Sequence, residues 1–463
     1  MSRTAAHPSR ESGQRGLAAL VVVTVLFIVT SLVAAYTSRN LVFEQRTSAN
    51  QYRSTQALEA AEAGIEWALA LLNSGVITAN CQASTSSADT TFRARYLAIN
   101  GDTGNITPRP SASGVPLWPS CVANGSGGWS CDCPSNAAPN PTAPVGSDVY
   151  PAFRVAFETV NPDGGGLPNR PGVVRIVSNG CTQLNNTCLD FPSQVAQGEG
   201  RATISVLVAL AGALGSRPLA PLTVRGDLSD ALALQASNGD TASGGVTIHA
   251  KGTANPAASG RVVSSIPGAP ASLSVLQNDD SLPANVTPPA LTAEHKWGLF
   301  TQTFKAWAPS YRNQPATLVV PCGNTGCSAT DIQAKVLLNP GRPLWLQGQL
   351  LLDSAVQIGS AQAPALLIVT GNSTASASVT ATAAATVNGL IYLQDRLVVD
   401  NTSAPPRNLW ADSAGATVRG ALIAEGDLGG SGAPSFVYDV GVLNRLRTVT
   451  GSFVRVPGGW RDF

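Results

Sequence analysis

Charge and histidine are scarce in this chain. Only 12% of its 463 residues are Asp, Glu, Lys or Arg, the net charge is +1, and there are three histidines. Proteins that bind nucleic acid through its phosphates carry a basic patch, so the lack of a basic cluster argues against such a partner. The HExxH, Walker and G-x-S-x-G motifs are also absent. The composition therefore predicts no catalytic residue, no metal and no cofactor.

Paired carboxylates are the one feature that could serve catalysis, because glycoside hydrolysis uses two of them. Each pair in this chain lies in a turn-like stretch (QNDDSLP, RGDLSD or AEGDLGG), where Asp usually caps the backbone. We therefore expect the following pairs to form turns and not an active site: Asp279 with Asp280, Asp227 with Asp230, and Glu425 with Asp427.

The longest uncharged run is Leu17–Ser38, which contains 22 residues without one ionisable acid or base. At about 1.5 Å per residue, a helix of this length spans roughly 33 Å, enough to cross a bilayer core. A basic leader with Arg3, Arg10 and Arg15 precedes it. A secretory signal peptide has a shorter apolar region followed by a cleavage site of small residues. The run therefore predicts a single membrane-spanning helix with its N-terminus in the cytoplasm.

The helical pattern continues beyond the apolar run. No proline and only one glycine occur between Ala34 and Asn73, and Asn73-Ser74-Gly75 is a typical helix end. Apolar residues spaced by three or four predict that the second half is amphipathic. A single helix over about 17–73 would be roughly 85 Å long. Its expected buried face consists of Leu58, Ala61, Ile65, Ala68 or Leu69, and Leu72.

Two segments of this helix resemble the N-terminal domain of PilX, a minor pilin of type IV pili. They are Gln14–Leu20, with the sequence QRGLAAL, and Gln56–Gly64, with the sequence QALEAAEAG. The resemblance covers about residues 13–75. The end of the chain, Val456–Phe463, also resembles the ends of long PilX-like proteins, whereas the remainder resembles them only loosely.

The resemblance implies a processing step and a set of partners. Residues 1–16 would be a class III leader that prepilin peptidase cleaves after Gly16, so that Leu17 becomes the methylated first residue. The protein would be a single-pass inner-membrane protein with a periplasmic C-terminal part before it enters the extracellular pilus. Its partners would be the inner membrane, major and minor pilins, prepilin peptidase and a tip adhesin. Residues of the 17–75 helix that would serve membrane insertion and assembly are Leu20, Val21, Leu26, Ile28 and Leu32.

Val21 departs from the pattern of the major pilins, which carry Glu at the fifth position of the mature chain. A carboxylate in apolar surroundings is costly unless it is paired, and the resemblance implies that its partner would be the N-terminal amine of a neighbouring subunit. Val21 removes both the cost and the pairing. The resemblance therefore implies a subunit suited to the pilus tip or to low-copy incorporation. A simple membrane anchor is the alternative interpretation.

All eight cysteines follow the apolar helix, and their even number predicts disulfides in an oxidising compartment. Cys322 with Cys327 and Cys181 with Cys188 would close short local loops. Three pairings remain open for the other four: Cys81, Cys121, Cys131 and Cys133. The Cys131-Asp132-Cys133 spacing is too short for a typical zinc site, so a metal is the weaker alternative.

The length of the chain predicts more than one core. Residues 76–212 contain three strand-like runs, Tyr150–Val160, Val173–Ser178 and Ala202–Leu210, and are expected to form a cysteine-containing pilin-like head. Residues 213–463 contain short apolar runs between small-residue turns, and each run, Val336–Leu338 among them, is expected to be a strand. These runs predict a β-rich domain, either a solenoid or a sandwich. The expected fold class is thus α+β.

Residues 294–308 are an exception within this β-rich segment, because their aromatic residues are spaced as on a helix. We expect these residues to pack on the β-domain, although a carbohydrate platform is an alternative. The protein as a whole is expected to be a structural component of type IV pili that acts in priming or at the tip. Alternatives are a membrane-anchored adhesin whose β-domain recognises a ligand and an anchored cell-wall enzyme. The aromatic residues concerned are Trp297, Phe300, Phe304 and Trp307.

Overall fold

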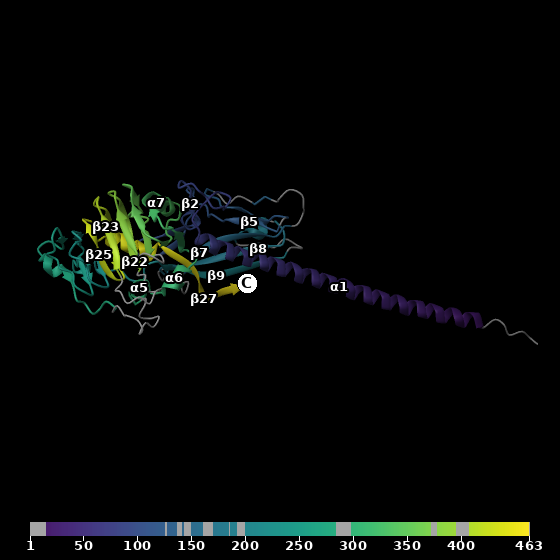
Figure 1. Ribbon diagram of the computed structural model, residues 1–463. Helices are drawn as coiled ribbons and strands as arrows, with labels where there is room; N and C mark the ends of the chain where they lie inside the picture. The colour runs from purple at the N-terminus through teal and green to yellow at the C-terminus, as the bar shows by residue number, and fades with distance from the viewer. Residues whose placement is uncertain are drawn as a thin grey trace, which may run out of the picture.

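The structure, a computed structural model, consists of a long helix, a β-sheet head and a stack of parallel strands. Figure 1 shows these three parts one after another along an elongated molecule, with the helix projecting from one end. The fold is therefore mixed α+β, a long N-terminal helix followed by a β-rich body, as the sequence predicts. The structure describes residues 15–125, 127–136, 141–142, 150–160, 170–184, 186–191, 200–283, 298–371, 377–394 and 407–462.

Helix α1, Arg15–Leu72, is continuous over 58 residues. It begins and ends within two residues of the expected 17–73 helix. Its first part is exposed to beyond residue 50, and its last turns lie on the head. The helix ends where Asn73 and Ser74 donate backbone hydrogen bonds to Ala70 and Leu71, 3.2 and 3.1 Å away.

The head is a six-stranded antiparallel sheet in the order β27-β9-β8-β7-β5-β6. One face of this sheet packs against the second half of α1. The strands are β5 (Ser120–Ala123), β6 (Trp129–Asp132), β7 (Ala152–Thr159), β8 (Val173–Cys181), β9 (Arg201–Gly212) and β27 (Gly451–Asp462). Smaller elements at its edges are β1 (Val76–Ile77), β2 (Thr90–Thr91), α2 (Phe92–Tyr96), β3 (Leu97–Ile99), β4 (Ile106–Pro108) and α3 (Asn186–Leu189).

The three strand-like runs predicted for the head correspond to β7, β8 and β9. Phe153, Val155 and Phe157 alternate along β7 and are buried in the core beneath α1. Arg154 is also buried, on the opposite face, where it pairs with Asp190 and lies over the Trp118 ring. Both faces of this strand are therefore covered.

The remaining strands form a β-solenoid, in which neighbouring strands are parallel and in register. A sandwich of antiparallel strands, the alternative from the sequence, would not produce such pairing. One sheet contains β10 (Leu222–Val224), β11 (Gln235–Ser237), β12 (Ile248–Ala250), β13 (Val262–Ser264), β14 (Val275–Leu276), β15 (Leu318–Pro321), β17 (Leu344–Gln347), β19 (Gln357–Ile358), β20 (Ala365–Thr370), β22 (Thr386–Gln394), β24 (Thr417–Ala424) and β26 (Ser435–Val437). The other contains β16 (Cys327–Ser328), β18 (Leu350–Leu352), β21 (Ser378–Ala381), β23 (Arg407–Asp412) and β25 (Asp427–Gly432).

A column of aliphatic side chains runs through the inside of the solenoid. Each turn of the solenoid, or rung, contributes one residue at the same register position. Every apolar side chain of the column except the first and the last is therefore stacked between two others. This stacking explains why the sequence shows short apolar runs at close intervals. The members, in spatial order, are Leu318, Leu344, Leu367, Ile391, Leu422, Leu222, Ile248 and Val275.

The spatial order of the rungs differs from their order in the chain. Strand β10 pairs with β24 on one side and with β12 on the other. Residues 222–276 therefore lie beyond the β24 rung, at the end of the molecule farthest from α1, and are drawn in teal in Figure 1.

Helices cover the outer face of the larger solenoid sheet. Strand β20 is thus buried on both sides, which explains its continuous apolar sequence. The covering helices are α5 (Gly298–Phe304), α6 (Ala308–Arg312) and α8 (Val440–Thr448). A further helix, α7 (Ala329–Leu338), includes the run Val336–Leu338, which the sequence wrongly predicts as a strand. Two 3-10 turns, η1 (Thr241–Ser243) and η2 (Ala271–Ser274), complete the elements.

The aromatic residues of α5 serve packing. Phe300 and Phe304 are buried and contact Tyr311 and Tyr392, with ring centroids 5.0–5.6 Å apart. A carbohydrate platform needs exposed rings, so this alternative is wrong for both phenylalanines. Trp307 is 39% exposed, whereas Trp297 lies outside the described residues.

The last strand of the chain returns to the head. Strand β27 pairs antiparallel with β9, and Gly451 lies opposite Gly212. The solenoid is therefore inserted between the two strands of a hairpin that belongs to the head sheet. The expected division into 76–212 and 213–463 consequently leaves out one head strand, because the two strands are adjacent in space but far apart in sequence.

Candidate assembly helix and head–solenoid junction

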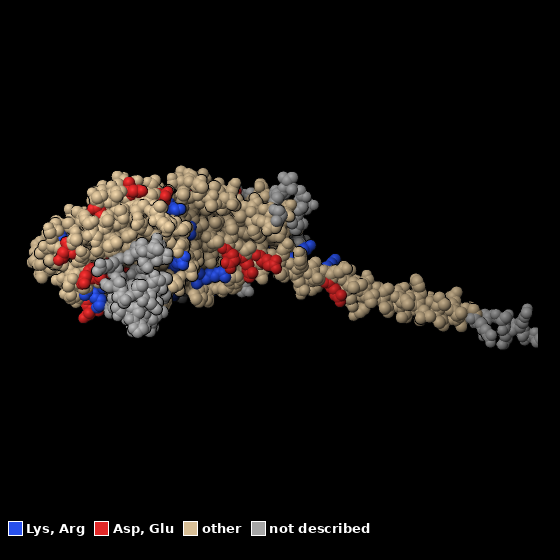
Figure 2. All heavy atoms as spheres, viewed as in Figure 1, with Lys and Arg blue, Asp and Glu red and all other residues tan. Residues whose placement is uncertain are grey.

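The first part of α1, Leu17–Ser38, is an apolar rod whose side chains are exposed on all sides. Figure 2 shows it as a projection almost without charge along its outer half. By length and composition this helix could span a membrane, with a mean hydropathy of 2.8 in its most apolar window. So much apolar surface is stable only in lipid or against other apolar surfaces.

The predicted processing and assembly residues lie on this rod or directly before it. Gly16 and Leu17 are in the first turn of α1. Large apolar side chains point outward all around the helix, as expected for a segment surrounded by lipid or by other helices. The exposed assembly residues are Leu20 (68%), Val21 (53%), Leu26 (58%), Ile28 (51%) and Leu32 (65%).

The few hydroxyls on the rod are satisfied within the helix. Thr24, Thr30 and Thr37 donate to the carbonyls of Leu20, Leu26 and Val33, at 2.7–2.9 Å. In hydrocarbon an unpaired hydroxyl would be costly, so these bonds make the threonines compatible with an apolar environment.

The second half of α1 packs on the head through small residues. A Cβ on Gly64 would lie 2.2 Å from the Ser178 hydroxyl, and a Cβ on Gly180 would lie 2.2 Å from the Ala57 carbonyl oxygen. The helix thus lies so close to β8 that neither Gly64 nor Gly180 has room for a methyl group. The alanines and the glycine of the QALEAAEAG segment therefore determine how closely the helix and the sheet approach.

Leu58 does not belong to the buried face, contrary to the prediction. It is 38% exposed, whereas Ala57, Ala60 and Ala61 are buried. The close approach to β8 selects alanine and glycine at this end of the stripe. The other predicted members, Ala61, Ile65, Ala68 and Leu72, are buried as expected. On the outer side, Glu66 pairs with Arg455 of β27.

Asn73 joins the end of α1 to the last strand of the chain. Its amide donates to the Phe453 carbonyl at 2.9 Å, and its carbonyl accepts from the Phe453 amide at 2.8 Å. Asn73 is buried, so this reciprocal pair replaces hydrogen bonds to water that the strand would otherwise lose. The sequence around Asn73 indicates only the end of a helix, because its partner Phe453 lies 380 residues further along the chain.

Arg93 joins three parts of the molecule. Its guanidinium donates to the carbonyls of Leu72 (2.8 Å), Gly341 (3.2 Å) and Gly451 (3.1 Å), which belong to the end of α1, the solenoid and the start of β27. It also lies over the Phe453 ring. No carboxylate pairs with it among the described residues. Burial lowers the pKa of Arg93 to about 9, with a smaller contribution from the nearby Arg342 guanidinium.

The carboxylates considered for catalysis serve the solenoid turns. Asp427 Oδ1 accepts from the Asp227 amide at 2.8 Å, and Asp227 Oδ1 accepts from the Thr253 amide at 2.7 Å. The carboxylates of Asp427 and Asp227 thus each link one rung of the solenoid to the next by a hydrogen bond. Asp230 lies 3.9 Å from Arg261, and Glu425 is buried 3.7 Å from Arg225.

A repeat in the sequence could have revealed this arrangement. Residues 222–228 read LTVRGDL, residues 422–428 read LIAEGDL, and the two segments are adjacent and in register. Within the described ranges, no three His, Cys, Asp or Glu side chains come together as a potential metal site.

The eight cysteines form four disulfides. The two local loops expected from the sequence are present as Cys181–Cys188 and Cys322–Cys327. The pairing that the sequence left open is Cys81 with Cys133 and Cys121 with Cys131, so the short Cys131-Asp132-Cys133 stretch contributes to two bridges in the head.

Comparison with known proteins identifies the N-terminal segment. Residues 15–66 match the family described as PilX N-terminal, which corresponds to α1 except for its last turns. The chain is therefore type IV pilin-like in this segment. No curated protein matches the chain significantly. Among solved structures, the competence-associated pilin ComZ from Thermus thermophilus aligns over 89% of this chain and 98% of that chain, with 12% identity and a TM-score of 0.22, too low to show a common fold.

Proposed function

We propose that this protein is a minor pilin of type IV pili. The observation that supports this best is the geometry of α1, whose apolar half projects from the body while its other half is packed on the head sheet. The match of residues 15–66 to PilX N-terminal supports the same function. The apolar half would anchor the chain in the inner membrane and then pack against the helices of other pilins in the filament.

A position at the pilus tip is consistent with the shape of the molecule. The solenoid lies at the end of the head opposite the apolar half of α1 (Figure 1). In a shaft of parallel helices, that space would be needed by the head of the next subunit. Val21 supports the same position, because it lacks the carboxylate expected to contact a subunit in front.

The proposed processing can be tested by mass spectrometry of the N-terminal peptide of the mature protein. We expect a peptide that begins at methylated Leu17 in cells with prepilin peptidase and retention of residues 1–16 in cells without it. A Gly16→Leu variant should also keep the leader. A chain that retains residues 1–16 in all three cases would overturn the proposal and leave a membrane anchor.

The tip position needs a separate measurement. Antibodies against the solenoid, detected by gold particles in electron micrographs, should label the ends of isolated pili. Labels spread evenly along the shaft would contradict the tip position without affecting the assignment as a pilin.

A second candidate function is adhesion through the solenoid. The rungs of residues 222–276 are farthest from the membrane helix, so they would be the outermost part of a tip subunit. If adhesion is the selected function, replacing residues 213–450 by a short turn should abolish attachment and leave pilus number unchanged. A loss of pili would instead assign the solenoid to assembly.

A further inference from the structure

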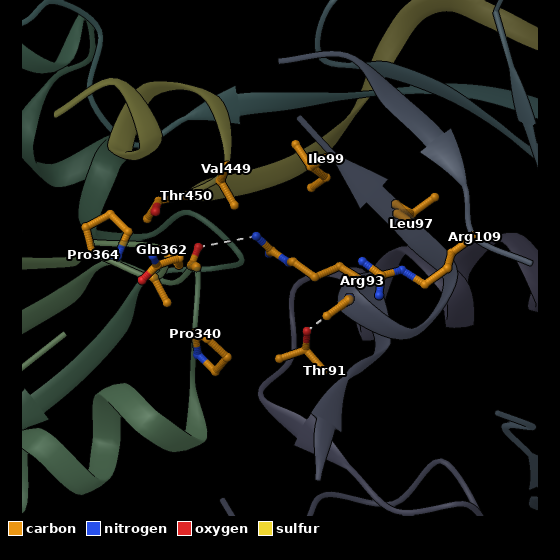
Figure 3. Close-up of a pocket in the computed structure, with 13 residues that line it drawn as sticks. Thr91, Arg93, Leu97, Ile99, Arg109, Pro340, Gln362, Pro364, Val449 and Thr450 are labelled. Carbon is orange, nitrogen blue, oxygen red and sulfur yellow. Dashed lines mark hydrogen bonds between the residues drawn. The ribbon is translucent and has the colours of Figure 1, made fainter. Parts of the chain in front are cut away.

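A cavity lies beside β6, at the edge of the head sheet. It is separate from the space at the head–solenoid junction, where Figure 3 shows the Arg93 guanidinium bonded to the Gly341 carbonyl. That guanidinium donates to three backbone carbonyls and so serves the junction itself. The cavity beside β6 has a volume of about 560 Å³, and all four residues of the strand line it.

This cavity includes the free edge of β6. Side chains alternate between the two faces of a strand. Cys131 points toward α1, because it is bridged to Cys121 in the core beneath that helix, and Trp129 lies on the same face. Ser130 and Asp132 lie on the opposite face. A cavity that touches all four residues therefore extends along the edge of the strand that β5 does not occupy.

Backbone groups of Trp129 and Cys131 point toward this edge. On β5, the Ala123 amide donates to the Pro151 carbonyl on the β7 side at 2.8 Å, and Cys121, two residues away, faces the same side. Their partners in register on β6 are Trp129 and Cys131, whose amides and carbonyls consequently point away from β5. Within the described ranges these groups form no hydrogen bond beyond the edge.

Two contacts fix the position of the edge. The disulfide between Cys121 and Cys131 joins β6 to β5, and the Trp129 ring contacts the buried Phe153 ring, with centroids 4.7 Å apart. An edge that is fixed before binding loses little conformational entropy when a ligand pairs with it. Unpaired backbone groups on such an edge are the template to which an extended chain adds as a further strand.

The edge is closed at one end, and a carboxylate lies there. The Cys133 amide donates to the Ala79 carbonyl at 2.7 Å, so an added chain must stop beside Asp132. Asp132 is the one charged residue among the described residues that line the cavity, and it forms no ion pair within that part of the chain. Burial raises the pKa of Asp132, because water solvates its carboxylate only in part. A cationic group at this end would compensate the charge.

The remaining wall is uncharged. It contains the side chains of Asn80 and Gln82, together with Pro141 and Thr142. Amides and hydroxyls both donate and accept hydrogen bonds, so this wall suits the alternating groups of a peptide backbone. A volume of about 560 Å³ admits a few residues of an extended chain and excludes a folded domain.

We propose that the edge of β6 binds the amino-terminal segment of an extended polypeptide, which pairs with Trp129 and Cys131 and places its α-ammonium group at Asp132. Because Asp132 is at the end of β6, such a chain runs antiparallel to β6 and continues the antiparallel order of the head sheet. The partner is thus a protein with a free and extended N-terminus. This inference is independent of the proposed role in pili.

The test uses the full chain in detergent micelles and 19F NMR of the peptide Val-Thr-Val-Thr-4-fluorophenylalanine amide. We expect a dissociation constant on the order of 1 mM, which a few backbone hydrogen bonds and one ion pair support. The N-acetylated peptide lacks the charge and should bind about tenfold more weakly. A peptide with N-methyl groups on all internal amides should not bind. Equal binding of the free and acetylated peptides, or binding of the methylated one, would overturn the proposal.

A charge variant locates the amino group. Asp132→Asn should weaken binding of the free peptide about tenfold and leave the acetylated peptide unchanged, because only the free peptide has an ion pair to lose. Asp102→Asn removes an exposed carboxylate outside the cavity and should affect neither peptide. If Asp132→Asn weakens both peptides equally, or neither, the amino group does not bind at Asp132 and the proposal is wrong.

Backbone pairing has its own measurement, which is amide hydrogen exchange at Trp129 and Cys131 by mass spectrometry with residue resolution. With 5 mM peptide, these amides should exchange about sixfold more slowly, since protection grows with the ratio of ligand concentration to dissociation constant. Thr142→Trp fills the cavity from the opposite wall and should abolish both binding and protection. Unchanged exchange in the natural chain, or protection that persists in Thr142→Trp, would show that the peptide binds elsewhere.

Discussion

At the scale of single residues, the contact between α1 and β8 depends on glycine. A Cβ on Gly180 would lie 2.2 Å from the Ala57 carbonyl oxygen and 2.4 Å from the Ala61 amide nitrogen. Both are backbone atoms, so the helix itself must move. We expect Gly180→Ala to destabilise the chain by about 1–3 kcal/mol, as overpacking usually does.

The measurement is the midpoint of urea unfolding of the full chain in micelles. Gly239→Ala is the matched control, because a Cβ there would meet nothing within 4 Å. The control should change stability by less than about 1 kcal/mol. Equal midpoints for the two variants would show that the helix is not held as closely as described.

The stability of the folded chain should depend on pH through Asp279. Its carboxylate accepts from the Ser281 amide at 2.8 Å and contacts His249 Nε2 at 2.7 Å, and Lys251 and Asp280 pair beside it. The Ser281 amide, together with a smaller effect of His249, lowers the pKa of Asp279. A lowered folded-state pKa means that the stabilisation is complete above the unfolded-state pKa of about 3.9 and is lost as the pH falls through the folded-state pKa.

We therefore expect Asp279→Asn to be less stable than the natural chain at pH 6, with a difference in stability that shrinks as the pH falls below about 3.9. Urea midpoints measured from pH 2 to pH 7 would show the two curves converging in acid. A difference that stays constant down to pH 2 would mean that charge on Asp279 does not contribute.

At the scale of elements, the four disulfides should differ in their contributions. Cys81–Cys133 spans 52 residues and ties the start of the head to β6, whereas Cys322–Cys327 spans 5 residues within one solenoid turn. A longer loop loses more entropy in the unfolded chain when it is closed. Replacing both cysteines by serine should destabilise by about 4 kcal/mol for the first pair and about 2 kcal/mol for the second. Thermal unfolding of the two double variants under oxidising conditions tests this order.

The elements were predictable from sequence where their pattern is local. The uncharged run and the spacing after it predict α1, and alternation along residues 150–160 predicts β7. The run Val336–Leu338 was misassigned because a short apolar run fits a strand or one helical turn equally well. The Asn73 and Arg93 contacts were not predictable, since their partners lie more than 240 residues away or are backbone carbonyls, which the sequence does not distinguish.

At the scale of the whole molecule, the hairpin of β9 and β27 predicts that the head can exist without the solenoid. Gly212 and Gly451 lie opposite each other, so a tight turn can join the strands. We expect replacement of residues 213–450 by Asn-Gly to give a folded head with the Cys81–Cys133, Cys121–Cys131 and Cys181–Cys188 bridges intact. Peptide mapping of the disulfides checks this, and scrambled bridges would show that the head needs the solenoid.

The same hairpin determines how the molecule carries mechanical load. A pull on the solenoid acts on β9 and β27 from the same end and in the same direction, so it does not peel these two strands apart. The force passes instead into the β8–β9 ladder, where nine residue pairs from Val173 to Cys181 resist sliding together, and through Phe453 into Asn73 at the end of α1. Tension on the outermost rungs would thus reach the long helix through hydrogen bonds that are loaded side by side.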